Sequence, residues 1–468
     1  MTFIPFARLS LLVAAALTVV SSVHATESMR IPANKNETMR VEAQQENPSV
    51  HQVAKRTMLG RQDAGLVNFA YYVNWAIYAG LGNFMPTDIV PDHLTHILYS
   101  FADIDPATGH LTLSDEWADE QITFDGDDTT EAGTNLYGCL KQMYKMKLAK
   151  RSLKVLLSVG GYTWSQEGHF GFVTNDAARA QFVTDAVQLI EDYGFDGIDL
   201  DFEFPANADE GTGYGKLFTE LRAAFDTLQT TKGDAEPYQL TVAVSSGAAN
   251  YANLDVPTMD AALSYWNLMA YDYSGAWLDF VANQANVIPD GVNNVSTKQA
   301  LDWYAGAGAT TNKMVLGIPI YGRGFEETDG LGATYNGVGA GTTDPGVWAY
   351  KNLPFAGAEV FENTTSISSY SYDSAKREWI SYDTPAISAA KGQYAADNGL
   401  AGTMFWELST DKVGEDSLVT AAAGKLGTLD ATENHINFPN SKWDNIKNNL
   451  GQSTTRRSHM RRTRAVSL

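Results

Sequence analysis

Strand-like and helix-like segments alternate along the chain from about residue 66 onward. Apolar runs of strand length occupy the ranges 67–75, 94–103, 154–161, 196–204, 239–247, 264–273, 313–320 and 400–408. Helical stretches are expected between several of them, at 134–149, 175–193, 212–230 and 296–306. Near-continuous apolar strands separated by helices are typical of a parallel sheet that is covered on both faces. Eight such units predict an α/β fold of the (β/α)₈ type, a TIM barrel, with a doubly wound sheet as the alternative.

Polar and aromatic residues gather where the predicted strands end. They are Trp75, Asp103, Gly160-Gly161, Glu203, Asp272 and Trp406. The carboxyl ends of all strands in a barrel meet at one mouth, where functional residues collect. A doubly wound sheet would offer one crevice instead. A ring of such residues therefore favours the barrel.

Residues 325–383 interrupt the alternation, because they are rich in Gly, Tyr and Thr and contain short β-like pieces such as 378–382. A stretch of this length between two barrel strands is usually a functional wall or an inserted subdomain. We expect a small α+β insertion domain between barrel strands seven and eight, which forms one wall of a deep cleft.

The two ends of the chain differ in composition from the rest. An apolar run at 9–20 follows Arg8, and small residues at 23–25 offer a cleavage site, which predicts a signal peptide over 1–25 and a secreted, extracellular protein. Residues 26–56 are polar and end in Lys55-Arg56, which suggests a removable pro-segment, with a merely disordered leader as the alternative. A catalytic domain over 57–450 and a basic, disordered tail over 451–468 complete the predicted organisation.

Charge and cysteine content exclude several classes of partner. The formal net charge of -22 disfavours nucleic acid and anionic membranes as partners, whereas a neutral, hydroxyl-rich substrate would not be repelled. The single cysteine, Cys139, permits no intramolecular disulfide. In a secreted protein the motifs at Asn294 and Asn363 would be glycosylation acceptors. We expect a monomer.

Four carboxylates lie within the apolar segment 195–203, which reads FDGIDLDFE. Side chains alternate along a strand, so Asp199, Asp201 and Glu203 share one face and Asp196 lies on the other. Three acids on a buried face repel each other unless a pKa rises, which is typical of acid–base catalysis. A structural cation site or pairing with Arg and Lys is the alternative. A calcium loop, however, would alternate Asp or Asn around a turn glycine.

Five motifs in order resemble the family 18 glycoside hydrolases. The acidic segment reads D-x-x-D-x-D-x-E over 196–203, and 158–161 and 269–272 resemble the S-x-G-G and M-x-Y-D strands of that family. Gly322-Arg323 and Trp406 also fall where the family has them. The resemblance covers about 66–450 and is strongest to secreted fungal endochitinases, with no metal or cofactor implied.

The resemblance implies a substrate-assisted mechanism in which the acetamido oxygen of N-acetylglucosamine is the nucleophile. Glu203 would protonate the glycosidic oxygen and later activate water. Asp201 would orient the acetamido N–H, and Asp199 would share a proton with Asp201. Tyr271 would donate its hydroxyl to the acetamido oxygen.

The family also suggests which residues bind sugar. Trp406 would form the floor under the sugar at the cleavage point, Trp277 a platform for the leaving-group sugars, and Arg323 a polar contact. The other candidates are Gly160, Gly161, Tyr162, Thr163, Phe204, Met269 and Asp272. Tyr71, Trp75 and Phe101 could line the cleft or belong to the core. Tyr162 and Phe202 stand where many relatives have Trp, and Phe202 is expected to pack behind the strand.

The sequence thus predicts a retaining, endo-acting chitinase that binds chitin and chito-oligosaccharides. An endo-β-N-acetylglucosaminidase that cuts N-glycan cores would need the same chemistry. A chitin-binding lectin on the same fold is the alternative from another class, although catalytically inactive relatives lose the glutamate that stands here as Glu203.

Overall fold

The computed structural model describes residues 65–452. The predicted signal peptide, the predicted pro-segment and residues 453–468 of the predicted tail lie outside this range.

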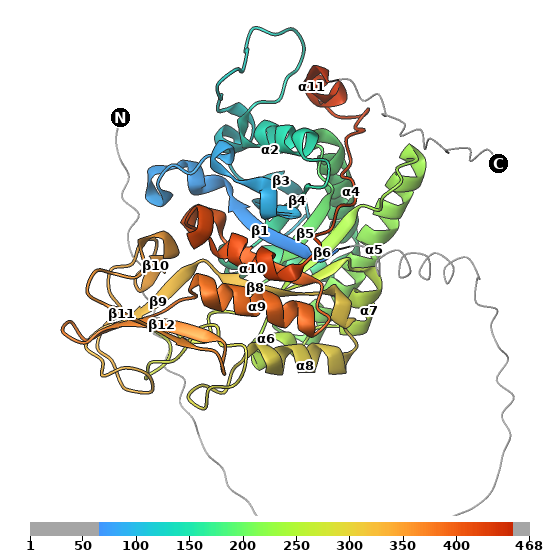
Figure 1. The fold of residues 1–468 in the computed structure, drawn as a ribbon. Coiled ribbons are helices and arrows are strands. Elements are labelled where there is room, and N and C mark those ends of the chain that lie inside the picture. Colours follow the sequence, from blue (N-terminus) through green and yellow to red (C-terminus); the bar gives the residue numbers. More distant parts are fainter. Residues whose placement is uncertain (1–64, 453–468) are drawn as a thin grey trace, which may run out of the picture. The chain divides into compact units, whose positions relative to one another are not determined.

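A closed barrel of parallel strands forms the centre of the fold (Figure 1). Its strands are β1 (Val67–Val73), β2 (His96–Ile104), β4 (Lys154–Gly160), β5 (Gly197–Asp201), β6 (Gln239–Ser245), β7 (Tyr265–Met269), β8 (Met314–Pro319) and β14 (Gly402–Trp406). Strand β1 pairs with β14 on one side and with β2 on the other, which closes the barrel. A short strand, β3 (Leu111–Leu113), pairs with β2 in the antiparallel sense. The predicted (β/α)₈ barrel is confirmed.

Helices lie outside the barrel strands (Figure 1). Four match the predicted ranges: α2 (Gly138–Ala149), α4 (Asp176–Tyr193), α5 (Ala208–Lys232) and α8 (Thr297–Ala307). Asn175, Asn207 and Ser296 cap the last three of these with side-chain oxygens, because each accepts a backbone N–H of the first turn. The other α-helices within residues 65–452 are α3 (Tyr162–Gln166), α6 (Ala248–Tyr251), α7 (Val256–Ala262), α9 (Pro385–Asp397), α10 (Leu418–Leu426) and α11 (Asp444–Lys447).

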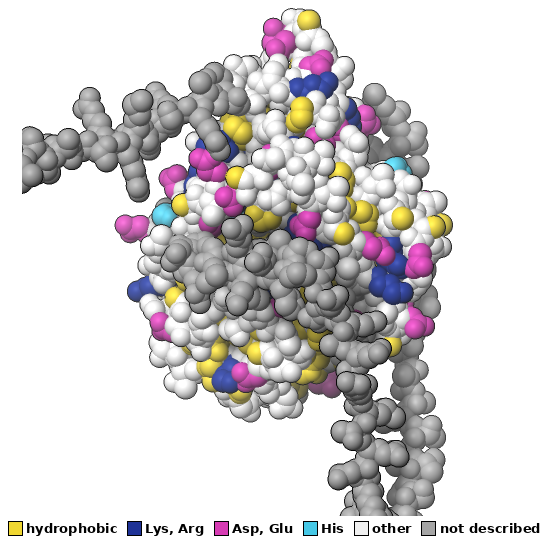
Figure 2. Space-filling view, turned by 90° about the vertical axis from the view of Figure 1, so that its right-hand side faces the viewer, with side chains coloured by type: hydrophobic (Ala, Val, Ile, Leu, Met, Phe, Trp, Pro, Cys, Tyr) yellow, Lys and Arg dark blue, Asp and Glu magenta, His cyan; other side chains and the backbone are white. Residues whose placement is uncertain are grey.

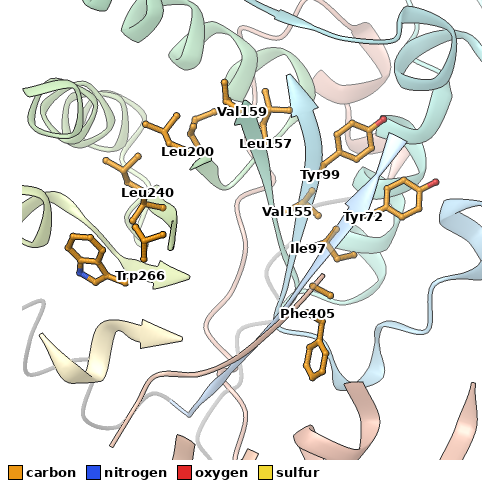
Figure 3. Packing of buried hydrophobic residues seen from close by; sticks show 14 of the residues in the cluster. Tyr72, Ile97, Tyr99, Val155, Leu157, Val159, Leu200, Leu240, Trp266 and Phe405 are labelled. Carbon is orange, nitrogen blue, oxygen red and sulfur yellow. The ribbon is translucent and has the colours of Figure 1, made fainter. Parts of the chain in front are cut away.

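The two faces of the barrel strands contribute to two different cores. Residues on the outer face pack against the helices, as Figure 3 shows for Val155, Leu157 and Val159 of β4. The neighbouring Leu156 belongs to a second cluster inside the barrel, together with Phe69 and other inward residues. This alternation is the period of two that a strand imposes. It sets which side chains can reach the barrel interior.

A second sheet is inserted between β8 and β14. It has five antiparallel strands in the order β10 (Val347–Ala349), β9 (Tyr321–Phe325), β13 (Glu378–Ser381), β12 (Ser368–Asp373) and β11 (Glu359–Asn363). The sheet thus begins at Tyr321, before the predicted start of the insertion. Among these residues the helical structure is limited to the 3-10 turn η8 (Tyr350–Asn352), so the predicted α component of the insertion is corrected to a single turn.

The surface of the described part carries mixed charge. On the face shown in Figure 2, acidic side chains are spread among basic and single hydrophobic ones rather than gathered in one patch. Every helix within residues 65–452 is too short or too polar to span a bilayer.

Candidate active site

Asp199 lies at the centre of the barrel and is surrounded by donors. Its Oδ2 accepts hydrogen bonds from Tyr71 Oη at 3.0 Å and Ser158 Oγ at 2.7 Å. Its Oδ1 accepts from Thr241 Oγ1 at 2.5 Å and Asn267 Nδ2 at 3.1 Å. Burial raises the pKa of Asp199, while hydrogen bonds from these donors oppose the rise. Each oxygen of the buried Asp199 carboxylate thus accepts two hydrogen bonds, which satisfies all its lone pairs.

Asp201, two residues along β5, has different surroundings. It is 4% exposed, and its Oδ1 has no hydrogen-bond partner among the described residues. Burial, and then the charges of Glu203 and Asp199, raise its pKa well above the usual value. A buried acceptor without a partner costs about 1–3 kcal/mol, so a donor from a ligand would relieve it. The shared proton predicted for Asp199 and Asp201 stays a prediction.

Glu203 lies beyond the end of β5 and is partly exposed. Burial, and then the charge of Asp272, raise the pKa of Glu203 to about 7. A carboxyl with such a pKa can give up a proton and take one back near neutral pH. The structure thus provides a group suited to general acid–base work at this position.

Tyr271 faces the acidic strand from the end of β7. Its side chain is 9% exposed, and its hydroxyl contacts Sδ of Met404 at 3.9 Å. Burial, and then the charges of Asp201 and Asp272, raise the pKa of its hydroxyl well above the usual value. Tyr271 therefore keeps its proton, which it donates to the weak thioether acceptor of Met404.

Asp272 connects the barrel to the inserted sheet. Its Oδ1 accepts from Tyr321 Oη at 2.6 Å and from Arg323 Nε at 2.9 Å, with Nη2 of Arg323 at 2.8 Å. The guanidinium carbon of Arg323 lies 5.0 Å from the ring centre of Trp277, which is 55% exposed. The predicted contacts Asp272, Trp277 and Arg323 are thus brought together at one side of the mouth.

Aromatic rings line the other side. Trp406, at the end of β14, stacks on Phe101 with ring centres 5.7 Å apart and meets Tyr71 edge-on at 5.2 Å. Trp75 lies against Phe101 at 6.1 Å and is 40% exposed. Tyr71 is 1% exposed and donates to Asp199, which favours the core alternative for this residue. Trp75 remains open to solvent, while Phe101 supports both tryptophans from below the surface.

Gly160 and Gly161 have φ values of +101° and +88°. A Cβ on Gly160 would lie 2.5 Å from the carbonyl oxygen of Asp201, and one on Gly161 would lie 2.7 Å from the ring of Phe101. Both positions therefore require glycine. The close approach visible here is between this turn and the protein's own acidic strand and aromatic residues.

The remaining predicted contacts lie around these groups. Tyr162 is 65% exposed, Thr163 is exposed, and Phe204 and Met269 are half-buried. Phe202 packs outward as expected, with its ring stacked on Phe170 at 4.4 Å.

Sequence reasoning missed three of the inner residues: Thr241, Asn267 and Tyr321. The signal for the first two was a polar side chain at an inward position of an apolar strand. The structure also gives Asp196 a partner, because Nζ of Lys147 lies 2.8 Å from its Oδ2. Asp196 is therefore an ion-paired structural residue, as its parity indicated.

Comparison with known proteins identifies the family. The model of the glycosyl hydrolases family 18 matches residues 67–411. Endochitinase 1 of Metarhizium robertsii is 40% identical over 402 residues, which cover 85% of this chain and 94% of that protein. The chain belongs to glycosyl hydrolases family 18, as its motifs indicated.

Solved structures share the fold. The class V chitinase of Nicotiana tobaccum in complex with NAG4 is 27% identical with a TM-score of 0.66, covering 78% of this chain and 99% of that one. A chitinase-like agglutinin of Robinia pseudoacacia is 24% identical with a TM-score of 0.64, covering 77% of this chain and all of that one. The agglutinin resembles this chain in fold alone.

Proposed function

We propose that the chain is a secreted, endo-acting chitinase that hydrolyses β-1,4 linkages between N-acetylglucosamine units with retention of configuration. The observation that carries this proposal is the arrangement of Glu203, whose pKa is raised to about 7, beside Asp201 with its unoccupied, buried Oδ1. The first group suits an acid catalyst, and the second suits an amide N–H of the substrate.

In the first step, Glu203 gives its proton to the glycosidic oxygen and the bond from that oxygen to the anomeric carbon breaks. The acetamido oxygen of the same sugar forms a new bond to the anomeric carbon, which creates an oxazolinium ion. Asp201 accepts the acetamido N–H and balances its positive charge. Tyr271 donates its hydroxyl to the acetamido oxygen and orients it for attack.

In the second step, the Glu203 carboxylate takes a proton from water, and the hydroxide oxygen attacks the anomeric carbon. The bond to the acetamido oxygen breaks, so two inversions leave the configuration unchanged. Trp406 supplies an apolar ring for the face of this sugar.

Endo-action on chitin is supported by the relatives. The Metarhizium protein is named an endochitinase, and the Nicotiana chitinase was solved with an N-acetylglucosamine tetramer, NAG4. The aromatic residues and the Asp272–Arg323–Trp277 group offer contacts to sugars on either side of the cleavage point.

The rival functions make different predictions. The agglutinin shows that this fold also occurs in a protein named for binding, so fold does not decide turnover. The presence of Glu203 with a raised pKa favours hydrolysis over a lectin. An endo-β-N-acetylglucosaminidase would use the same groups but would cut a high-mannose glycopeptide.

The test is a time course of chitohexaose cleavage by the full chain, with proton NMR of the fresh anomer, alongside Glu203→Gln. We expect an initial β-anomer from the wild type, and binding without turnover from the variant. An initial α-anomer would exclude retention, and binding without cleavage by the wild type would identify a lectin. Cleavage of the glycopeptide but not of chitohexaose would identify the rival hydrolase.

We also propose that residues 1–25 direct secretion and that cleavage after Lys55-Arg56 releases a chain that begins at Thr57. Amino-terminal sequencing of the protein secreted from a eukaryotic host would detect Thr57 as the first residue. A mature protein that begins near residue 26 would reject the pro-segment but keep the signal peptide.

A further inference from the structure

Within residues 65–452, the hydrogen bonds to the backbone of Glu203 come from outside the barrel strands. Strand β5 ends at Asp201, whose last pairings are with Gly160 of β4 and Ala243 of β6. Glu203 lies two residues further on, where strand geometry no longer sets its position. An acid catalyst must nevertheless lie within hydrogen-bond reach of the glycosidic oxygen. Some other contact must therefore position this residue.

Side chains of the short helix α3 hydrogen-bond to both the N–H and the carbonyl oxygen of Glu203. The backbone N–H of Glu203 donates to Ser165 Oγ at 2.9 Å, and its carbonyl oxygen accepts from Gln166 Nε2 at 2.6 Å. The hydroxyl of Ser165 in turn donates to the carbonyl oxygen of Asp201 at 3.4 Å. Two adjacent side chains thus bind both polar groups of the Glu203 backbone and link them to the last strand residue.

Helix α3 is itself fixed to the barrel. Gly161, just before the helix, donates its N–H to the carbonyl oxygen of Asp201 at 2.8 Å. Trp164 stacks on His169 with ring centres 6.3 Å apart, and Nδ1 of His169 lies 2.6 Å from Oδ1 of Asp103, on β2. The helix is therefore anchored to both β5 and β2 by contacts other than those to Glu203, so that it can act as a rigid support.

We infer that Ser165 and Gln166 are positioning residues for the catalytic acid Glu203. This inference rests on the proposed hydrolase function of the same site. Loss of either side chain frees one polar group of the Glu203 backbone and lets the carboxyl move relative to the glycosidic oxygen. A displacement of 1 Å from the reactive geometry costs about a hundredfold in rate.

The inference is tested by steady-state kinetics on chitohexaose with Ser165→Ala and Gln166→Ala. We expect kcat to fall about tenfold to a hundredfold, with KM changed by less than about threefold, because the substrate contacts remain. Ser165→Thr keeps the hydroxyl and is expected to retain most of the activity. In Gln166→Glu the new carboxylate cannot donate and repels Glu203, so the basic limb of the kcat/KM profile moves to higher pH.

Two control variants match these changes away from the site. Ser388 is buried and donates to the carbonyl oxygen of Leu418 at 2.7 Å, so Ser388→Ala removes a comparable buried hydroxyl. Gln181 donates to Asp185 at 2.9 Å on the surface of α4, so Gln181→Ala removes a comparable exposed amide. We expect both controls to keep the wild-type kcat.

The outcomes separate this inference from the proposed function. A wild type that leaves chitohexaose uncut rejects the proposed function. A wild type that cuts it while Gln166→Ala keeps kcat within about twofold rejects the positioning role. Because Gln166 is exposed, its substitution decides the matter even where Ser165→Ala does not fold. Equal losses of kcat in the control variants would likewise reject it.

Discussion

Replacing Glu203, the proposed catalytic acid, should stabilise the protein, and the gain should depend on pH. Burial and Asp272 raise the pKa of Glu203 from 4.5 to about 7. Between these two values the folded state holds a proton that the unfolded state has released. Stability therefore falls as pH rises through this window, and the penalty is complete above about pH 7. Glu203→Gln removes this titration.

The magnitude follows from the size of the shift. A pKa difference of about 2.5 units corresponds to about 3 kcal/mol of unfolding free energy. A domain of about 390 residues has an unfolding entropy of about 0.8 kcal/mol per kelvin, so Tm should rise by about 4 °C. The charge of Glu203 also raises the pKa of Asp201. Removing that charge removes the repulsion between the two carboxylates, which also increases the stability of the variant.

The assay is thermal unfolding of the wild type and Glu203→Gln at about pH 4 and about pH 8, on either side of the window. New contacts made by the amide of the variant alter Tm by the same amount at both pH values. The quantity that tests the reasoning is therefore the change, between the two pH values, in the Tm difference between variant and wild type. At the lower pH we expect the variant and the wild type to differ in Tm only by this pH-independent amount. At the higher pH we expect the Tm of the variant to be higher by a further amount of about 4 °C. Glu359→Gln, an exposed substitution on β11, is the control. A Tm difference that stays constant between the two pH values would refute the reasoning.

Three further substitutions test individual groups. Tyr271→Phe should lower kcat about a hundredfold with little change in KM, and an unchanged kcat would exclude the hydroxyl from catalysis. Asp272→Asn removes the second cause of the raised pKa of Glu203 and leaves Arg323 unneutralised, so the basic limb of the kcat/KM profile should move to lower pH; a stationary limb would contradict this origin. Trp406→Ala should raise KM for chitohexaose about tenfold by removing a stacking surface, and an unchanged KM would place the ring outside the binding site.

The barrel could be predicted because its strands are marked locally, each by an apolar run that ends in polar residues. Strand parity also placed Asp199 and Asp201 on the inner face and Phe202 on the outer one. Helices α9 and α10 were missed. Both begin at a residue that caps the first turn with its side chain, Thr384 before Pro385 and Ser417, so that local start signals were present but overlooked.

The rest of the site depends on distant parts of the chain. Strand parity alone could not place Glu203, because β5 ends at Asp201 and the backbone of Glu203 is instead hydrogen-bonded to a side chain of α3. Lys147 was not recognised as the partner of Asp196, since the pair is brought together only when α2 packs against β4. Among the donors of Asp199, Ser158 belongs to a motif, whereas Tyr71, Thr241 and Asn267 lie outside the motif residues. Such pairings follow from the closed architecture and not from any single segment.

Closure of the barrel is itself a condition for the hydrogen bond between Tyr71 and Asp199. Among the barrel strands, β5 neighbours only β4 and β6, and β1 lies three strands away. In a flat sheet of the same order, three spacings of about 4.8 Å would separate Tyr71 from Asp199 by about 14 Å. Curvature instead brings the two side chains to 3.0 Å inside the barrel. Ser158 and Thr241 reach Asp199 from the neighbouring strands, whereas Tyr71 reaches it because the barrel is closed. The neighbouring Asp201 keeps a buried Oδ1 without a partner among the described residues.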